Sequence, residues 1–296
     1  MSRGAKVLYC VYLALLMGFT GFTALDTFVI ERVETTLEAP QPTQTPSAAS
    51  AAPTVTENSY QDEHIAIQID TRRLDDTTVY IADVTLDSPE YLKTALAQNA
   101  YGKNVTETTS AIAARQNAIL AINGDYYGSR ERGYVLRNGS IYRTTGTEGQ
   151  EDLVIYRDGT FGIIEEQRTT LQALQSDGAA QVLSFGPALM EDGVVSVQES
   201  DLRGKDRTRN PRTAIGCIDA LHYVFVVADG RTDASDGLTI PELAEVMACL
   251  GAQTAYNLDG GGSSCMVFDG EVVNHPTTTG NRTKEREVSD IVYIGF

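Results

Sequence analysis

The residues best suited to chemistry lie in one short block, residues 257–264, with the sequence NLDGGGSS. Three consecutive glycines after Asp259 exceed what a two-residue hairpin turn needs, and they let backbone N–H groups approach an anion closely. The lysine of a nucleotide-binding P-loop and the spacing of a nucleophile elbow are both absent. The block predicts an anion-binding loop in an active site; a tight structural junction is the alternative. Its candidate binding residues are Asn257, Gly260, Gly261, Gly262, Ser263 and Ser264.

A strand, a helix and a second strand lead into this block. Residues 222–228 have the composition of a strand, residues 239–251 begin with a capping box and end at a glycine, and residues 253–258 are the next strand. Short connections make this a βαβ unit whose strands run parallel. Their carboxyl ends, marked by Asp229 and Asp259, should therefore lie at one edge of a sheet, where α/β proteins build sites.

A hairpin should bring Arg212 to the same edge. Residues 213–218 are predicted to pair antiparallel with residues 222–228, which places Arg212 opposite position 229 or so. Arg212, Asp229 and Asp259 are thereby predicted to converge from three segments. For Arg212 and Asp229 taken alone, a structural ion pair is the alternative.

Other polar residues offer weaker signals. Asn123 and Asp125 follow a predicted strand at residues 118–122 and are candidate substrate-binding residues, with an Asn-Gly turn as the alternative. The three histidines are scattered, which argues against a histidine triad or a zinc site. The acidic loop 229–236 lacks the full ligand series of an EF-hand, so no cofactor is required by the sequence, and a divalent cation, Ca²⁺ or Mg²⁺, stays an open alternative.

The N-terminal segment, residues 1–26, is predicted to be a cytoplasmic tip and a transmembrane signal-anchor. Arg3 and Lys6 precede a run without charged residues that just spans a bilayer, and acidic residues follow it. This asymmetry predicts a cytoplasmic N-terminus and an extracytoplasmic domain. A cleaved signal peptide is the alternative.

Residues 27–59 are rich in Pro, Thr, Ser and Ala and are predicted to form a disordered linker, and residues 60–296 a single catalytic domain. The predicted fold class is α/β, with α+β as the alternative: a mixed sheet flanked by helices. Asn-Gly at 138–139 and Asp-Gly at 158–159 predict hairpins in an antiparallel middle region. Helices are predicted to start at Ser88-Pro89-Glu90 and to cover about 108–117.

Charge and cysteine content exclude some classes of protein. A net charge of −17 without clustered lysines and arginines argues against a nucleic-acid partner. Three widely spaced cysteines in the domain are neither a disulfide framework nor a zinc motif, although a single bridge stays open. The oligomeric state is not indicated.

Short segments spread over about residues 110–296 resemble one known family. In chain order they read ING at 122–124, SFGP at 184–187, PRTAIG at 211–216, DGR at 229–231, GLT at 237–239, ELA at 242–244 and the block at 257–264, followed by Asn274, Arg286 and Val288-Ser289. These segments resemble the phosphodiester glycosidase family, and the glycine block is the most specific of them.

The resemblance implies hydrolysis of the anomeric bond of a GlcNAc-like sugar-1-phosphodiester in a cell-surface glycan or exopolysaccharide. It implies that Asp259 acts as nucleophile or as base for water, that Asp229 is its partner or an orienter of Arg212, and that Arg212 clamps the phosphate. Arg231 and Arg286 would extend that clamp. A non-catalytic glycan-binding module and a metal-dependent phosphodiesterase cutting the P–O bond are the alternatives.

The resemblance also implies how the substrate is held. Asn123 and Asn257 would bind sugar hydroxyls or an N-acetyl group, and the amides of Gly260–Gly262 would face the anion. The implied partners are thus a carbohydrate phosphodiester and, through the N-terminal helix, the membrane.

Overall fold

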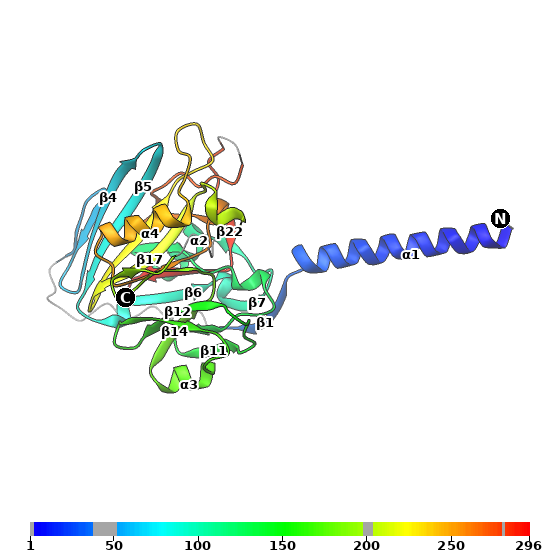
Figure 1. Cartoon of the computed structure of the whole chain (residues 1–296), viewed down its shortest axis with the longest axis horizontal. Coiled ribbons are helices and arrows are strands. Elements are labelled where there is room, and N and C mark those ends of the chain that lie inside the picture. The colour runs from blue at the N-terminus through cyan, green and yellow to red at the C-terminus, as the bar shows by residue number, and fades with distance from the viewer. Residues whose placement is uncertain (1–2, 38–51, 198–203, 280–281) are drawn as a thin grey trace.

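The structure is a computed structural model that describes residues 3–37, 52–197, 204–279 and 282–296. Its α-helices are α1 (Arg3–Phe28), α2 (Thr109–Gln116), α3 (Leu171–Ser176) and α4 (Ile240–Cys249). Helix α1 projects away from the rest of the chain (Figure 1), and Val7–Phe28 within it is long and apolar enough to cross a membrane. The other helices pack on sheets.

Most strands belong to three sheets, in which every ladder between described strands is antiparallel. The central sheet has the order β16 (Val194–Val195), β15 (Ala188–Glu191), β19 (Thr254–Asn257), β17 (Arg212–Asp219), β18 (His222–Ala228), β5 (Thr77–Leu86), β4 (Ile65–Leu74), β3 (Ser59–Gln61) and β2 (Thr54–Val55). The β12 sheet has the order β11 (Ser140–Arg143), β10 (Val135–Arg137), β14 (Ala179–Leu183), β12 (Glu151–Tyr156) and β13 (Phe161–Glu165). The β9 sheet has the order β21 (Glu271–Val272), β20 (Met266–Phe268), β9 (Leu120–Asn123), β23 (Asp290–Ile294) and β6 (Leu92–Leu96).

Two short ladders complete the fold. β1 (Arg32–Thr36) pairs with β7 (Ala100–Lys103), and β22 (Glu287–Val288) pairs with β8 (Glu107–Thr108). The first of these joins the segment after α1 to the body of the domain.

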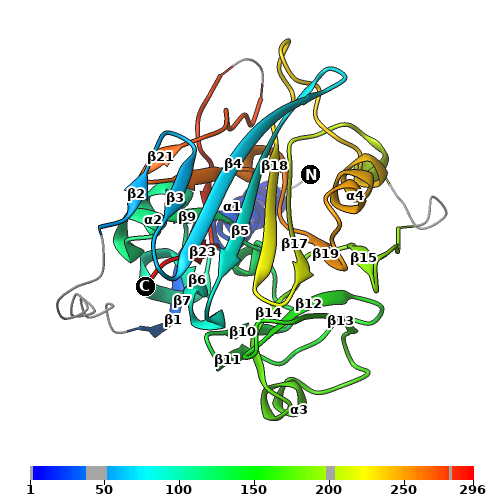
Figure 2. The same cartoon turned by 90° about the vertical axis from the view of Figure 1, so that its left-hand side faces the viewer.

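The main hydrophobic core lies where the three sheets face one another (Figure 2), and buried side chains such as Ile67, Leu153, Phe225 and Val292 pack in it. Helix α4 covers the other face of the central sheet, α2 packs against the β9 sheet, and α3 packs against the β12 sheet. A single domain dominated by sheets with flanking helices confirms the predicted fold class.

Local signals in the sequence account for several elements. Asn138-Gly139 and Asp158-Gly159 form the predicted hairpin turns, with positive φ at Asn138, Gly139 and Gly159. The predicted capping box is present: the Thr239 hydroxyl accepts from the Glu242 amide, and the Glu242 carboxylate accepts from the Thr239 amide. These turns and caps fix where strands and helices begin.

Three expectations need correction. Ser88-Pro89-Glu90 starts only a 3₁₀ turn, after which Leu92–Leu96 is strand β6 instead of a helix, because it pairs with β23. β18 and β19 do run in the same direction, but β17 lies between them and pairs antiparallel with both. The linker predicted at 27–59 contains strand β1 and, near its end, β2; residues 38–51 of that prediction lie outside the described residues.

Candidate active site

Four strand ends meet around the glycine block. β18 ends just before Asp229, β19 ends two residues before Asp259, β17 begins at Arg212, and β9 of the neighbouring sheet ends at Asn123. The hairpin register pairs Arg212 with Ala228, one residue from the predicted position. The strand polarity therefore brings these segments together, as expected, from two sheets instead of one.

Asn123 joins the two sheets beneath the block. This fully buried side chain donates from Nδ2 to the Asp259 carbonyl at 2.6 Å, and its Oδ1 accepts from Thr213 Oγ1 at 2.8 Å and from the Cys265 amide at 3.2 Å. Its amide is thus committed to the protein. The geometry gives it a positioning role for Asp259, whereas the sequence suggested contact with a sugar.

Asp259 is partly exposed at the point where the block reaches the surface. Burial raises the pKa of its carboxyl above the ordinary value, and the Ser263 hydroxyl, Arg286, the Gly260 amide and Arg130 oppose that rise. The Gly260 N–H donates to Oδ1 at 2.9 Å. A carboxyl that is reachable from solvent and flanked by cations can serve as nucleophile or base.

Two guanidinium groups pack directly on the glycines. A Cβ at Gly261, where φ is +64°, would lie 2.9 Å from Arg231 Nη2, and a Cβ at Gly262 would lie 2.8 Å from Arg286 Nη2 and 2.3 Å from Thr278 Oγ1. Arg231 is itself held by a hydrogen bond from Nη1 to the Thr278 carbonyl at 2.9 Å. The glycines are therefore needed because cations occupy the space of their side chains.

Some polar groups of the block are hydrogen-bonded within the protein and others are not. Two of its three glycine amides donate within the protein, Gly260 N to Asp259 Oδ1 and Gly261 N to the Pro211 carbonyl at 2.8 Å, so the cations, more than these amides, can meet an anion. Two buried side-chain oxygens, Asn257 Oδ1 and Ser264 Oγ, have no hydrogen-bond partner among the described residues. Buried polar atoms are normally satisfied, so unpaired ones beside Asp259 suit a site that takes a polar ligand or water.

Arg212 lies against the same loop without pairing with Asp229. Its Nε donates to the Leu238 carbonyl at 2.9 Å and its Nη2 to the Thr208 carbonyl at 3.0 Å. Burial, with a smaller contribution from Arg231, lowers the pKa of Arg212 to about 10, so it stays cationic at neutral pH. It adds a third cation, which unlike Arg231 and Arg286 is buried, near Gly260.

Asp229 belongs to a separate hydrogen-bond cluster. Its carboxylate accepts from Asn274 Nδ2 at 3.1 Å, from the His275 amide at 2.9 Å and from the Tyr80 hydroxyl at 3.1 Å, with His275 Nδ1 at 3.2 Å. Asn274 Nδ2 also donates to the Ser264 carbonyl. Asp229 therefore holds the segment after β21 against the block and does not orient Arg212. His275 carried no sequence signal beyond its place after Asn274.

Asp125 is part of a buried ion cluster. Arg137 Nη2 lies 2.8 Å from Asp125 Oδ2 and 2.7 Å from Asp290 Oδ2, and all three side chains are 2% exposed or less. The Asp125 carboxylate also accepts from the Ser184 amide at 2.7 Å. It thus holds the loop after β9 in place, with no access for a substrate. The sequence contains no local sign of Arg137, which lies on a strand of the β12 sheet.

Metal-ligand groups do not gather elsewhere in the described part of the chain. No set of three His, Cys, Asp or Glu side chains among those residues could hold a metal ion, and the loop with Asp233 and Asp236 forms none. Cys217, Cys249 and Cys265 are free thiols, of which Cys217 and Cys265 are buried.

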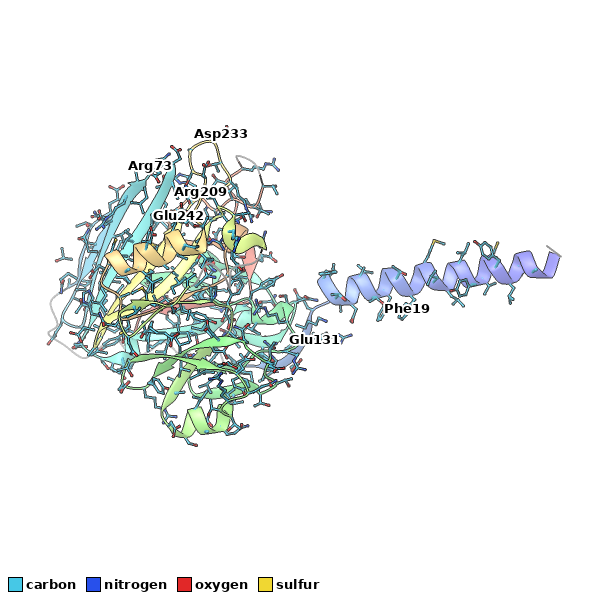
Figure 3. The ribbon with its side chains drawn as sticks, in the orientation of Figure 1. Phe19, Arg73, Glu131, Arg209, Asp233 and Glu242 are labelled. Carbon is cyan, nitrogen blue, oxygen red and sulfur yellow. The ribbon has the colours of Figure 1, made fainter. Side chains whose placement is uncertain are left out.

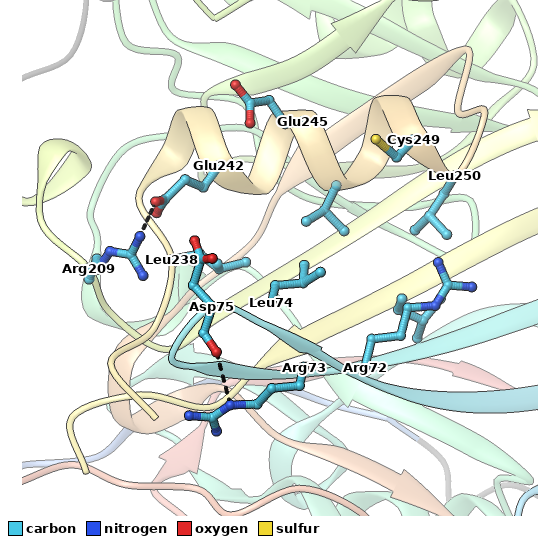
Figure 4. A pocket seen from close by; sticks show the side chains of 12 residues that line it. Arg72, Arg73, Leu74, Asp75, Arg209, Leu238, Glu242, Glu245, Cys249 and Leu250 are labelled. Atoms are coloured by element: carbon cyan, nitrogen blue, oxygen red, sulfur yellow. Dashed lines mark hydrogen bonds and ion pairs between the residues drawn. The ribbon is translucent and has the colours of Figure 1, made fainter. Parts of the chain in front are cut away.

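A cavity of about 490 Å³ lies away from the block, between α4 and the β4–β5 hairpin (Figure 4). Three of its charged side chains are engaged with the protein: Arg209 pairs with Glu242, and Arg73 Nε donates to the Asp75 carbonyl at 3.1 Å. We assign no role in the site to this cavity.

A sheet-dominated domain places a partly exposed carboxyl and three arginines around a glycine block, an arrangement suited to holding an anion. Residues 116–295 match the family model described as phosphodiester glycosidase. The match covers more than half of the chain, and the chain belongs to the phosphodiester glycosidase family.

Curated relatives are similar over part of their length. The chain is 27% identical over 201 residues to the SPbeta prophage-derived uncharacterized protein YomE of Bacillus subtilis (strain 168), which covers 66% of this chain and 31% of that protein. It is 28% identical over 159 residues to N-acetylglucosamine-1-phosphodiester alpha-N-acetylglucosaminidase of Mus musculus, which covers 49% of this chain and 30% of that protein. The chain thus spans about a third of the length of these relatives.

Solved structures share the fold. The zebrafish N-acetylglucosamine-1-phosphodiester alpha-N-acetylglucosaminidase catalytic domain, auto-inhibited by its pro-peptide, superposes with a TM-score of 0.61 at 22% identity, covering 78% of this chain and 82% of that one. A hypothetical protein from Synechocystis gives a TM-score of 0.54 at 15% identity, covering 79% and 62%.

Proposed function

We propose that this chain is a hydrolase that breaks the bond between the anomeric carbon and the phosphodiester oxygen of a GlcNAc-like sugar-1-phosphodiester. The observation that carries the proposal is the packing of Arg231 and Arg286 on Gly261 and Gly262 beside the surface carboxyl of Asp259. Water adds to the anomeric carbon, the C–O bond breaks, and a phosphomonoester leaves. Guanidinium groups stabilise the charge on that leaving group, so it needs little protonation.

In this scheme Asp259 acts in its ionised form, as nucleophile or as base for water. Arg286 and Arg130 favour that carboxylate, whereas burial, the larger effect, raises its pKa. Arg231, Arg286 and the buried Arg212 hold the phosphate. The unpaired Asn257 Oδ1 and Ser264 Oγ face the polar part of the substrate.

Helix α1 supports a proposal for where in the cell the domain lies. A helix with an apolar stretch at Val7–Phe28, preceded by Arg3 and Lys6, favours a single-pass anchor with the domain outside the cytoplasmic membrane. The substrate of such an enzyme is a phosphodiester-linked sugar in a cell-surface glycan or exopolysaccharide.

Product analysis tests the reaction. The full chain is incubated with a GlcNAc-1-phosphodiester, with and without divalent cation, and free sugar and sugar phosphate are quantified. Free sugar is the expected product. Sugar phosphate would identify cleavage of the P–O bond and overturn the proposal, and binding without either product would identify a glycan-binding module.

Two matched variants test the role of Asp259. Asp259→Asn is expected to lower kcat by roughly 10²–10⁴-fold with an unchanged melting temperature. Asp192→Asn makes the same change at an exposed aspartate on the β15–β16 turn and should leave turnover unchanged. Full activity of Asp259→Asn would remove Asp259 from the reaction while leaving the product assay valid.

A further inference from the structure

A second polar cavity lies at the foot of α1. It has a volume of about 410 Å³ and is bordered by β1, β7 and the segment from Tyr127 to Thr145. Four basic side chains and two acidic ones line it: Arg32, Lys103, Arg130 and Arg143, with Glu34 and Glu131. Arg32 also pairs with Asp26. Even with Asp26 counted, basic side chains outnumber acidic ones here, a local exception in a chain of net charge −17 that suits an anion.

Arg143 forms the inner wall of this cavity. Its Nε donates to the Gly133 carbonyl at 2.7 Å and its Nη1 to the Tyr127 carbonyl at 3.1 Å, so the guanidinium is fixed in orientation. Its Nη2 is buried and has no hydrogen-bond partner among the described residues. This fixed guanidinium therefore contributes positive charge to the cavity wall, while its Nη2 donor is enclosed by the protein.

The outer wall combines a lysine with aromatic rings. Lys103 lies 3.1 Å from the exposed Glu131 carboxylate, a pair that solvent weakens and a stronger anion can replace. The Tyr101 ring stacks on Tyr127 at 5.3 Å and meets Tyr142 at 5.0 Å. Tyr101 and Tyr127 are buried, so this stack gives the cavity a rigid base.

The fold holds this cavity close to the end of α1. The helix ends at Phe28, and Arg32, four residues later, already pairs with Lys103 in the β1–β7 ladder. The Asn104 side chain also donates to the Ile30 carbonyl at 3.0 Å. Figure 3 shows Glu131 on the side from which α1 emerges, while Arg73 and Asp233 lie far from it.

Helix length sets the depth of the cavity. The apolar stretch Val7–Phe28 has 22 residues and so is about 33 Å long, which matches the hydrocarbon thickness of a bilayer. Arg32 then lies at the level of the lipid head groups. The cavity opens where phosphate groups of the outer leaflet are found.

We propose that this cavity binds the phosphate group of an anionic membrane lipid, an inference that rests on the proposed anchoring of the chain by α1. Lys103 and Arg32 contact the phosphate, and the fixed charge of Arg143 attracts it from the inner wall. Binding fixes the domain on the membrane with the β7 side toward the bilayer.

Lipid titration of the full chain tests this site. The protein in a neutral detergent is titrated with phosphatidylglycerol, phosphatidylcholine or inorganic phosphate, and its melting temperature is followed. Phosphatidylglycerol is expected to give a saturable rise, which phosphatidylcholine does not give. Lys103→Gln and Arg32→Gln should each need about fivefold more phosphatidylglycerol for half of that rise.

A matched variant and two outcomes decide the result. Arg72→Gln removes a half-exposed arginine on β4, far from the cavity, and should titrate like the unchanged protein. Absence of a saturable rise, or an equal weakening by Arg72→Gln, would overturn the site. A full rise with inorganic phosphate alone would assign a soluble anion and overturn the lipid.

The same variants separate this inference from the proposed reaction. Lys103→Gln and Arg32→Gln should hydrolyse a soluble sugar-1-phosphodiester as the unchanged chain does. Loss of lipid binding with normal hydrolysis thus concerns this cavity, whereas failure of hydrolysis in the unchanged chain concerns the proposed function.

Discussion

The proposed reaction depends on the ionised form of Asp259, whose carboxyl lies beside the three arginines. Burial disfavours the carboxylate, while the Ser263 hydroxyl and the nearby cations Arg286 and Arg130 favour it, and burial is the larger effect on the pKa. A group whose pKa is raised loses its charge at a higher pH than an ordinary aspartate. Activity that depends on the ionised form should therefore fall on the acid side at a correspondingly higher pH.

Ser263→Ala tests this balance. Without the hydroxyl the carboxylate is less favoured, so the pKa of Asp259 rises further and the acid limb of the kcat/KM profile moves to higher pH. The measurement is the pH profile of sugar release. Ser264→Ala removes the neighbouring buried hydroxyl and should leave the limb in place. An acid limb at the same pH in Ser263→Ala as in the unchanged chain, or an equal shift in both variants, would contradict the stabilisation of the Asp259 carboxylate by Ser263.

Arg137 illustrates a buried charge whose function is structural. Burial alone would lower the pKa of Arg137, but Asp125 and Asp290 raise it above its ordinary value. Burial and Asp125 also raise the pKa of Asp290, although Arg137 opposes this rise. The two carboxylates are therefore tolerable inside the protein only with the guanidinium between them.

Arg137→Gln should destabilise the domain by about 3–5 kcal/mol at pH 8, because it leaves two buried carboxylates without a cation. The loss should be smaller at pH 5, where Asp290, whose pKa is raised, binds a proton and loses its charge. Thermal unfolding at the two pH values measures both effects. Arg72→Gln, which breaks an exposed ion pair with Asp70, should cost less than about 1 kcal/mol at either pH. A loss of equal size at both pH values would contradict the account.

At the scale of elements, the glycine block forms a surface on which side chains from other segments pack. Arg231 and Arg286 belong to separate segments, and each reaches a different glycine. The Thr278 hydroxyl occupies the space above Gly262 as well. The shape of the loop therefore sets the spacing of the two cations.

Gly262→Ala should lower activity more than stability. The added methyl would sit 2.3 Å from Thr278 Oγ1 and 2.8 Å from Arg286 Nη2, so these flexible side chains must move away. We expect kcat/KM to fall by roughly tenfold or more, because a displaced guanidinium no longer meets the phosphate. Gly295→Ala, whose methyl would make ordinary contacts at 3.4 Å with Tyr293, is the control for activity and melting temperature. Unchanged kcat/KM in Gly262→Ala would show that the reaction does not depend on the position of the Arg286 guanidinium.

Elements with strong local signals could be predicted from the sequence. The Asn-Gly and Asp-Gly turns, the capping box at Thr239 and the β17–β18 hairpin all depend on residues close together in the chain. Strand polarity then placed Arg212, Asp229 and Asp259 around one block. The same reasoning could not give the side-chain partners of Asp229, because Tyr80 and His275 come from distant strands and loops.

Elements fixed by distant partners could not be predicted. Leu92–Leu96 follows a helix-start signal but becomes a strand because it pairs with β23, almost two hundred residues later in the chain. Arg137 lies on β10 and meets Asp290 across the boundary between two sheets. The residues next to Arg137 in the sequence give no sign of its contact with Asp290.

At the scale of the whole molecule, the domain is attached at one side. The β1–β7 ladder continues directly from α1 and joins the β7 side to the helix, while α4 covers a face of the central sheet. A helix of this kind orients the domain only if it spans a membrane. The side of the membrane on which the domain lies then decides which glycans it can reach.

Cys249 provides a native reporter of that side. It is exposed near the end of α4 (Figure 4), whereas Cys217 and Cys265 are buried and Cys10 lies in the apolar stretch of α1. A membrane-impermeant maleimide added to intact cells is expected to label the full chain, because the proposed topology places the domain outside. Cys249→Ser should abolish the labelling, and Cys217→Ser should leave it intact. Labelling only after lysis would place the domain in the cytoplasm and remove a cell-surface glycan from its reach.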